Sequence, residues 1–497
     1  MRPKPSRNPG SLMNTLSRAL PLAASLLAAL ILVLAPCRAW ALFGSITVAD
    51  EIEMGKKFDN AVRAQMGFVD DPEIVAYVKG VVDRVATALP PQPWTIRSAV
   101  VHHNSMNAFA IPGGYIYIFT GLILNVDNED ELAAVIGHEL AHVTERHVAK
   151  RMDQMRLISV ASIAGMLAGV LIGTKGGGTS TNAIGQAVAT GSIAGAQSAF
   201  LMYTRENERE ADQVGINYLL KSGYNPDAMP QTFELMNKRR WFMTGDSIPS
   251  YLSTHPGLDE RIGYLRDRIR RMPAETVARE YSRDKFQRIQ TLVRARMSGA
   301  DTALAYYNNK PKAEMLCLDF AGKGIALERL KRVSQAEHEF ETAIACGEND
   351  PLVLREAGIF YFNKGDFAKA GPYLQKAGIM NPRDAMSLFF TARLMAERKD
   401  FKAAISTMER VVREVPEDSE VRLHLGRMFG ESGNLFDAHL QLSYAALYGR
   451  DKKNSNFHLD RTKALAVTEE QKKRLAELQK AIGERFETGA QVEKRRP

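Results

Sequence analysis

The C-terminal half of the chain repeats with a period of 34 residues. Four segments align from their first residues, which are Cys317, Pro351, Ala385 and Ser419. Their eighth positions hold small residues, namely Gly324, Gly358, Ala392 and Gly426. Their twenty-fourth positions hold large apolar residues, namely Phe340, Leu374, Met408 and Leu442. Small residues let the two helices of a unit approach closely, and large residues fill the contact with the neighbouring unit, so the pattern predicts stacked helical pairs.

This pattern resembles the tetratricopeptide repeat, whose units are antiparallel helix pairs. The resemblance implies an α-solenoid of four repeats over residues 317–452. We expect residues 273–316 to form a linker and a degenerate helical pair, and residues 453–497 a capping helix and a polar tail. Cys317 and Cys346 begin and end the helix pair of one unit, so a disulfide between them is geometrically possible. Two small buried cysteines are the alternative.

Residues 1–41 have the three parts of a cleaved signal peptide. A basic start with Arg2, Lys4, Arg7 and Arg18 precedes an apolar run, and Ala39-Trp40-Ala41 fits a cleavage site. A retained anchor and a lipoprotein at Cys37 are the alternatives. Cleavage predicts a periplasmic protein, with membrane association left open. This segment also carries five of the basic residues and no acid, so the net charge of +8 falls to about +3 without it. We therefore expect no nucleic-acid partner.

Residues 42–272 have a mixed pattern that predicts an α+β domain, mostly helical with a small β-sheet. Residues 95–120 are β-rich, with Pro112-Gly113-Gly114 as a turn between two strands. Residues 128–153 are predicted to form one helix, capped by Asn128 with Glu131 as its capping-box partner. Residues 157–202 are rich in Gly and Ala and nearly uncharged. They are interpreted as a flap or hairpin over the site or the bilayer surface, as a simply packed hairpin, or as an inserted one.

The motif His138-Glu139-Leu140-Ala141-His142 predicts a catalytic zinc site. Because His138 and His142 are four residues apart on a helix, both imidazoles lie on one face and can bind the same ion. Zinc lowers the pKa of a bound water, and Glu139 is placed to take the proton from it.

A catalytic zinc needs a third protein ligand and an open fourth position. One class of such sites takes a histidine six residues after the second ligand, but Val148 stands there. His147 is one position away and is interpreted as a surface histidine or one that supports a ligand.

A second class takes a glutamate from a later helix. Glu208 can serve as that ligand, and Asp212 lies one turn further on the same face. Asp212 can then reach a ligand histidine or the reacting centre. Glu206 and Glu210 remain competitors because they carry the same type of side chain.

These motifs, together with Asn107-Ala108-Phe109 and Pro112-Gly113-Gly114, resemble the minigluzincin peptidases, which have a zincin-type domain. The resemblance implies one Zn²⁺ per chain held by His138, His142 and Glu208, with Glu139 as the general base. It implies that Asp212 supports the site or donates a proton. It also implies a substrate-holding edge strand that contains Asn107, Ala108, Phe109 and Ala110.

His255 lies in a sharp loop, Ser253-Thr254-His255-Pro256-Gly257. The resemblance implies that a histidine in this setting can take the fourth zinc position and hold the enzyme inactive. A donor to the tetrahedral oxyanion and a loop histidine bonded to backbone are the alternatives.

The resemblance implies an exported zinc metalloendopeptidase that degrades misfolded or stalled outer-membrane β-barrel proteins and supports their assembly. Its repeats would recruit these clients or the barrel-assembly machinery, with peripheral membrane contact left open. The alternative is a repeat-based chaperone or adaptor in which proteolysis is secondary or self-inhibited. The integral-membrane members of the family do not fit, because the sequence lacks several long apolar spans.

Overall fold

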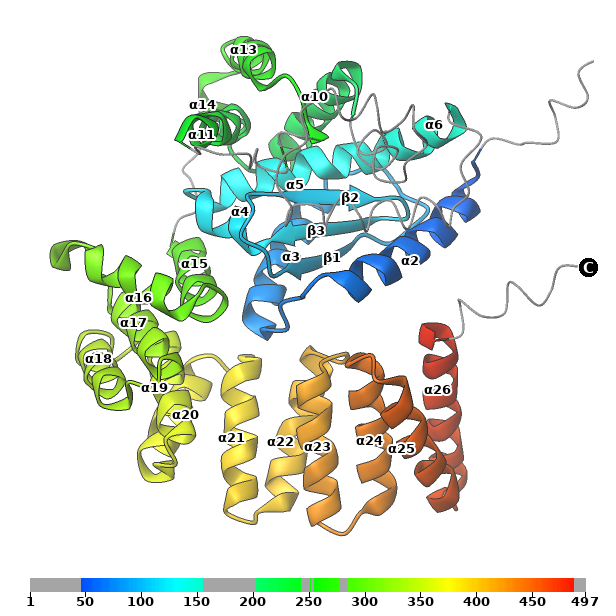
Figure 1. Cartoon of the computed structure of the whole chain (residues 1–497), viewed down its shortest axis with the longest axis vertical. Helices are drawn as coiled ribbons and strands as arrows, with labels where there is room; N and C mark the ends of the chain where they lie inside the picture. The colour runs from blue at the N-terminus through cyan, green and yellow to red at the C-terminus, as the bar shows by residue number, and fades with distance from the viewer. Residues whose placement is uncertain (1–45, 155–202, 243–250, 252–253, 278–283, 487–497) are drawn as a thin grey trace, which may run out of the picture.

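The computed structural model describes residues 46–154, 203–242, 251, 254–277 and 284–486 (Figure 1). The predicted signal peptide and the Gly/Ala-rich segment 157–202 lie outside the described residues. The architecture is mostly helical, with one small sheet near the N-terminus followed by a row of helical pairs. No helix in the described ranges has the length and apolar character needed to span a membrane.

The sheet has three strands, β1 (Arg97–Val101), β2 (Ala108–Ile111) and β3 (Tyr115–Phe119), in the order β1-β3-β2. β1 runs parallel to β3, whereas β2 is antiparallel to it. The predicted turn joins β2 to β3, and Gly113 and Gly114 in it have φ angles of 81° and 86°. A Cβ at Gly114 would also lie 2.8 Å from the Thr95 carbonyl oxygen, so this turn requires glycine. Because β2 stands last in the order β1-β3-β2, it is an edge strand among the strands that the structure describes.

The same part of the chain contains the helices that precede and follow the sheet in sequence. They are α2 (Val48–Gln65), α3 (Pro72–Ala86), α4 (Thr120–Asn125), α5 (Glu129–Thr144), α6 (His147–Gln154), α10 (Arg205–Ser222), α11 (Ala228–Phe242), α13 (Leu258–Ile269) and α14 (Ala274–Val277). α5 packs on β2 and β3, and α10 and α11 pack on α5 (Figure 1). α5 is thus the central helix of this part of the protein.

The single helix predicted over residues 128–153 is wrong, because the structure divides it into α5 and α6. The break falls at Arg146, which has a left-handed φ of 55° that no α-helix accommodates. The Arg146 guanidinium is held by the Glu51 carboxylate, with Nε 2.6 Å from Oε1, and by the Ile46 carbonyl at 2.9 Å. Contacts with a distant segment therefore fix a kink that local sequence does not signal.

The predicted cap at Asn128 is present, with its side chain accepting the Glu131 amide at 3.0 Å. Glu131 does not complete the capping box with the Asn128 backbone amide. Its carboxylate accepts the Asp127 amide at 2.8 Å instead, one residue further back.

The second part of the chain consists of helical pairs that begin where the 34-residue period predicts. The eight repeat helices are α17 (Cys317–Arg329), α18 (Val333–Cys346), α19 (Pro351–Asn363), α20 (Phe367–Met380), α21 (Ala385–Glu397), α22 (Phe401–Glu414), α23 (Ser419–Glu431) and α24 (Leu435–Tyr448). A Cβ at Gly324 would lie 2.8 Å from the Phe340 ring, and one at Gly358 would lie 2.7 Å from Leu374. The small eighth and large twenty-fourth positions therefore meet inside these pairs.

Further helices flank the repeats: α15 (Asp284–Met297) and α16 (Ala300–Asn309), the 3-10 turn Lys312–Glu314, α25 (Lys452–Leu465) and α26 (Glu469–Phe486). α15 and α16 form the degenerate pair that the sequence predicts, and α26 is the predicted terminal helix. α25 is an additional helix, because the sequence predicts a single capping helix and a polar tail over residues 453–497. Cys317 and Cys346 are joined by a disulfide, with their Cα atoms 5.4 Å apart.

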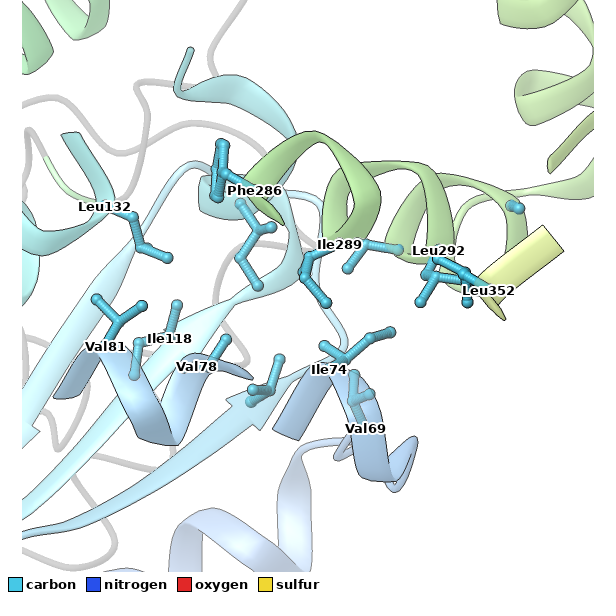
Figure 2. Close-up of a cluster of buried hydrophobic side chains, with 14 of the residues drawn as sticks. Val69, Ile74, Val78, Val81, Ile118, Leu132, Phe286, Ile289, Leu292 and Leu352 are labelled. Atoms are coloured by element: carbon cyan, nitrogen blue, oxygen red, sulfur yellow. The ribbon is translucent and has the colours of Figure 1, made fainter. Parts of the chain in front are cut away.

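One apolar core joins the sheet region to the repeats. Figure 2 shows side chains of α15 lying beside those of α3, β3, α5 and α19. The labelled members include Val78 of α3, Ile118 of β3, Leu132 of α5, Ile289 of α15 and Leu352 of α19. The degenerate pair thus fastens the repeats to the sheet-containing part.

Candidate metal centre

Four side chains that are far apart in sequence meet at one buried point. His138 and His142 come from α5, Glu208 from α10, and His255 from the loop before α13. One nitrogen or carboxylate oxygen from each lies within 4.8 Å of all the others. His138 Nε2 is 3.0 Å from His142 Nε2, and His255 Nδ1 is 2.9 Å from Glu208 Oε1. All four residues are buried, at 2% exposure or less.

Glu208 reaches the histidines because α10 crosses α5 at very close range. The contact is made by Gly137 and Gly215, where a Cβ on Gly215 would lie 3.1 Å from Gly137 backbone atoms. A Cβ at this distance is closer than ordinary van der Waals contact, so glycine favours the close approach of the two helices. Thr204 begins α10 with a capping box that includes Asn207. The second helix of the site is thereby fixed in both position and starting point.

Of the competing acids, only Glu208 enters the cluster. Glu206 is exposed, and Glu210 points to His147, with its Oε2 2.9 Å from His147 Nε2. Glu208 and Asp212 share the inward face of α10 and are both fully buried.

Asp212 lies directly behind the first histidine. Its Oδ1 is 2.9 Å from His138 Nδ1, the nitrogen that points away from the cluster. Tyr264 donates its hydroxyl hydrogen to Asp212 as well. Burial raises the pKa of this carboxyl, but the Arg261 charge and the hydrogen bonds from His138 and Arg261 outweigh burial and lower the pKa to about 2. Asp212 is therefore ionised at neutral pH and accepts hydrogen bonds.

Arg261 of α13 is a site residue that sequence analysis missed. Its guanidinium donates to both Asp212 oxygens, at 2.8 and 2.7 Å, and forms an ion pair with Glu208. The residue is only 3% exposed. A lone arginine in an amphipathic helix resembles a solvated surface charge, so nothing in the local sequence distinguishes it. Tyr203 was missed as well, and its ring stacks on His142 with centroids 3.7 Å apart.

His255 lies inside the cluster with both ring nitrogens directed at carboxylates. Nε2 is 3.3 Å from Glu139 Oε1, while Nδ1 approaches Glu208. Its backbone amide bonds to the Tyr251 carbonyl at 2.9 Å, and the two rings stack at 4.2 Å. A histidine bonded only to backbone would not have these side-chain contacts, so the geometry favours the two site-based interpretations.

Glu139 is completely buried, and neither of its carboxylate oxygens has a hydrogen-bond partner within the described part of the chain. Burial raises its pKa above the usual value for a glutamate. A buried carboxylate without hydrogen bonds is costly, so such a group is expected where a ligand or water completes the site.

The edge strand lies next to this cluster. A small pocket between them is lined by Ala110 and Ile111 on one side and by His142 and Tyr203 on the other. Of the four predicted substrate-holding residues, Asn107 directly precedes β2, and Ala108, Phe109 and Ala110 lie in it. Phe109 stacks on Tyr117 of the neighbouring strand, with ring centroids 4.7 Å apart.

The donor set fits a divalent transition metal. Two imidazoles and one carboxylate are a known catalytic zinc set, and His255 adds a fourth side chain within reach of the same point. Asp212 behind His138 supplies the outer hydrogen bond that such ligands usually have. The residues present can therefore hold a metal ion in a geometry suited to hydrolysis.

Comparison with known proteins gives a match between residues 70–269 and the model of peptidase family M48. A Vibrio cholerae protein named putative beta-barrel assembly-enhancing protease is 30% identical over 299 residues, covering 59% of this chain and 60% of that protein. The beta-barrel assembly-enhancing protease of Escherichia coli K12 is 29% identical over 229 residues, covering 46% and 45%. The chain thus spans about half the length of these curated relatives.

More distant matches extend beyond bacteria. The mitochondrial metalloendopeptidase OMA1 of Arabidopsis thaliana is 30% identical over 164 residues, covering 33% of this chain and 29% of that protein. Among solved structures, MamA from Desulfovibrio magneticus RS-1 is 19% identical and covers 34% of this chain and 96% of that one, with a TM-score of 0.29. That score is too low to bear on the fold, which rests on the helices described above.

Proposed function

We propose that this chain, which carries a peptidase family M48 domain over residues 70–269, is a zinc-dependent endopeptidase of the bacterial cell envelope. One observation carries the proposal: His138, His142 and Glu208 converge in a buried site beside Glu139, whose oxygens accept no hydrogen bond from the described residues. This arrangement combines a metal-binding set with a general base, which peptide hydrolysis requires.

The ligand residues would be His138, His142 and Glu208. Zinc bound there supplies Lewis acidity, which polarises a peptide carbonyl and makes water acidic enough to lose a proton near neutral pH. Glu139 accepts that proton and returns it to the leaving nitrogen, a role suited to its raised pKa. Asp212 holds the Nδ1 hydrogen of His138 and so fixes that ring. Arg261 keeps Asp212 ionised for this task.

The substrate is an extended polypeptide that pairs with β2, an edge strand among the described strands. Main-chain hydrogen bonds along Asn107, Ala108, Phe109 and Ala110 would hold it largely without regard to sequence. An unfolded β-barrel protein exposes unpaired strands of this kind. The names of the bacterial relatives support this class of client and a role in barrel assembly. We propose that misfolded or stalled outer-membrane proteins are degraded, and that the repeats recruit them or the assembly machinery.

A chaperone or adaptor role is the second candidate. The position of His255 favours it, because a ring in contact with both Glu139 and Glu208 would block the open metal position. A protease held inactive in this way would bind clients through its repeats without cleaving them for much of the time.

The first prediction tests the zinc enzyme itself. The purified mature chain should contain one zinc per molecule by atomic emission and should cleave casein. A chelator should abolish cleavage, and added Zn²⁺ should restore it, because the activation of water depends on the bound metal. Glu208→Gln should lose zinc, whereas Glu206→Gln, on the exposed side of the same helix, should keep it. A wild-type chain without stoichiometric zinc would refute the proposal.

The second prediction concerns His255. His255→Ala should leave casein cleavage unchanged or increase it, because the ring no longer occupies the space between Glu139 and Glu208. Initial rates of casein cleavage measure this, with the exposed His338→Ala as the control. A loss of about a hundredfold or more would instead assign His255 to the oxyanion of the transition state.

A further inference from the structure

His147 connects the second histidine of the metal centre to a carboxylate. Its Nδ1 lies 2.8 Å from His142 Nδ1, and its Nε2 lies 2.9 Å from Glu210 Oε2. The His147 side chain is fully buried, while that of Glu210 is 45% exposed. The three side chains therefore form one hydrogen-bonded line from the cluster to the protein surface.

The kink at Arg146 creates this arrangement. In an uninterrupted helix, a residue five positions after His142 would lie roughly 140° around the axis from it. The left-handed φ of Arg146 ends α5 and turns the chain, so that His147 begins α6 with its ring against His142. The Glu51 and Ile46 contacts that hold Arg146 consequently also hold His147 in place.

The outward ring nitrogens of His138 and His142 have different hydrogen-bond partners. His138 meets the Asp212 carboxylate directly through its outward nitrogen. Among the described residues, the outward nitrogen of His142 meets His147 and no carboxylate. Asp212 therefore contacts His138 directly, whereas Glu210 reaches His142 through the imidazole of His147.

We propose that His147 and Glu210 are positioning residues that fix the ring orientation and tautomer of His142 as a metal ligand. The inference rests on the proposed zinc site. His142 Nε2 faces His138 and Glu208, so this nitrogen binds the metal and Nδ1 carries the hydrogen. His142 Nδ1–H then donates to His147 Nδ1, and His147 Nε2–H donates to Glu210. Because the Glu210 carboxylate only accepts, it selects this tautomer at both rings.

Zinc affinity tests the proposal, measured on the full mature chain by competition with a chelating dye. His147→Ala should weaken zinc binding roughly 10- to 100-fold, the range typical for loss of an outer partner of a ligand. His147→Asn should retain most of the affinity, because its side-chain oxygen can replace Nδ1 as acceptor. Glu210→Gln should lose affinity by a smaller factor, and the exposed Glu206→Gln one turn earlier serves as its matched control.

The outcomes are separable from those of the proposed function. A wild-type chain that binds no zinc refutes the metal site, whatever the His147 variants do. If wild type binds zinc and both His147→Ala and Glu210→Gln bind it equally well, the positioning role is wrong. Equal losses in His147→Ala and His147→Asn would also overturn it, because the ring and not its hydrogen bonds would then matter. Should His147→Ala fail to fold, the surface variant Glu210→Gln decides.

Discussion

Glu139→Gln is expected to reduce casein cleavage by about 10²- to 10⁴-fold while leaving one zinc per chain. Glutamine has the shape of glutamate but cannot accept a proton, so the variant removes the general base alone. Neither Glu139 oxygen has a hydrogen-bond partner in the described ranges, and its 3.3 Å contact with His255 lies inside the site, so the substitution should leave the fold intact. Cleavage rates and zinc content, measured on the same preparation, check both halves of the expectation.

Glu206→Gln is the control, because it makes the same chemical change on an exposed surface. The Glu139→Gln variant also separates the two candidate functions in cells. If proteolysis is the main role, Glu139→Gln should lose client turnover. If the chain acts as an adaptor, the variant should retain its cellular role. A Glu139→Gln protein that cleaves casein at the wild-type rate would contradict the mechanism proposed above.

Arg355→Met is expected to destabilise the protein by about 3–5 kcal/mol, the effect typical of removing one partner from a buried ion pair. Arg355 of α19 is 2% exposed and forms ion pairs with Glu73 of α3, with Glu356 and with Asp384. Methionine has a similar length but no charge, so these carboxylates would lose their central cation. The free energy of unfolding in urea, followed by helical circular dichroism, measures the effect.

The same network fastens the sheet-containing part to the repeats. Arg296 of α15 extends it to Asp71, which caps α3, and to Glu356. Breaking it should also make the junction more open to limited proteolysis. Arg383→Met is the matched control, since this neighbour of Asp384 is exposed and should change stability by no more than about 0.5 kcal/mol. Equal stabilities of the two variants would show that the network does not hold the parts together.

Features with a short repeat or a fixed spacing could be predicted. The 34-residue period located the first helix of each pair, because interdigitating small and large residues recur at fixed positions. The turn at Gly113 and Gly114 was predicted because few residues besides glycine adopt its φ angles. The start of the helix that carries His138 and His142 was predicted from the cap at Asn128. The end of this helix was predicted wrongly, because the kink at Arg146 depends on Glu51, 95 residues earlier.

The sequence by itself determined the metal-binding motif, the repeat architecture and the chemical type of each candidate ligand. These depend on backbone periodicity and side-chain chemistry, which act over a few residues. Only the tertiary structure decided that Arg261 holds Asp212 from 49 positions away, and that His255 lies between Glu139 and Glu208. It also decided that His147 meets His142, through a kink fixed elsewhere in the fold. Such contacts arise when helices pack, and burial then makes each unpaired charge too costly to leave without a partner.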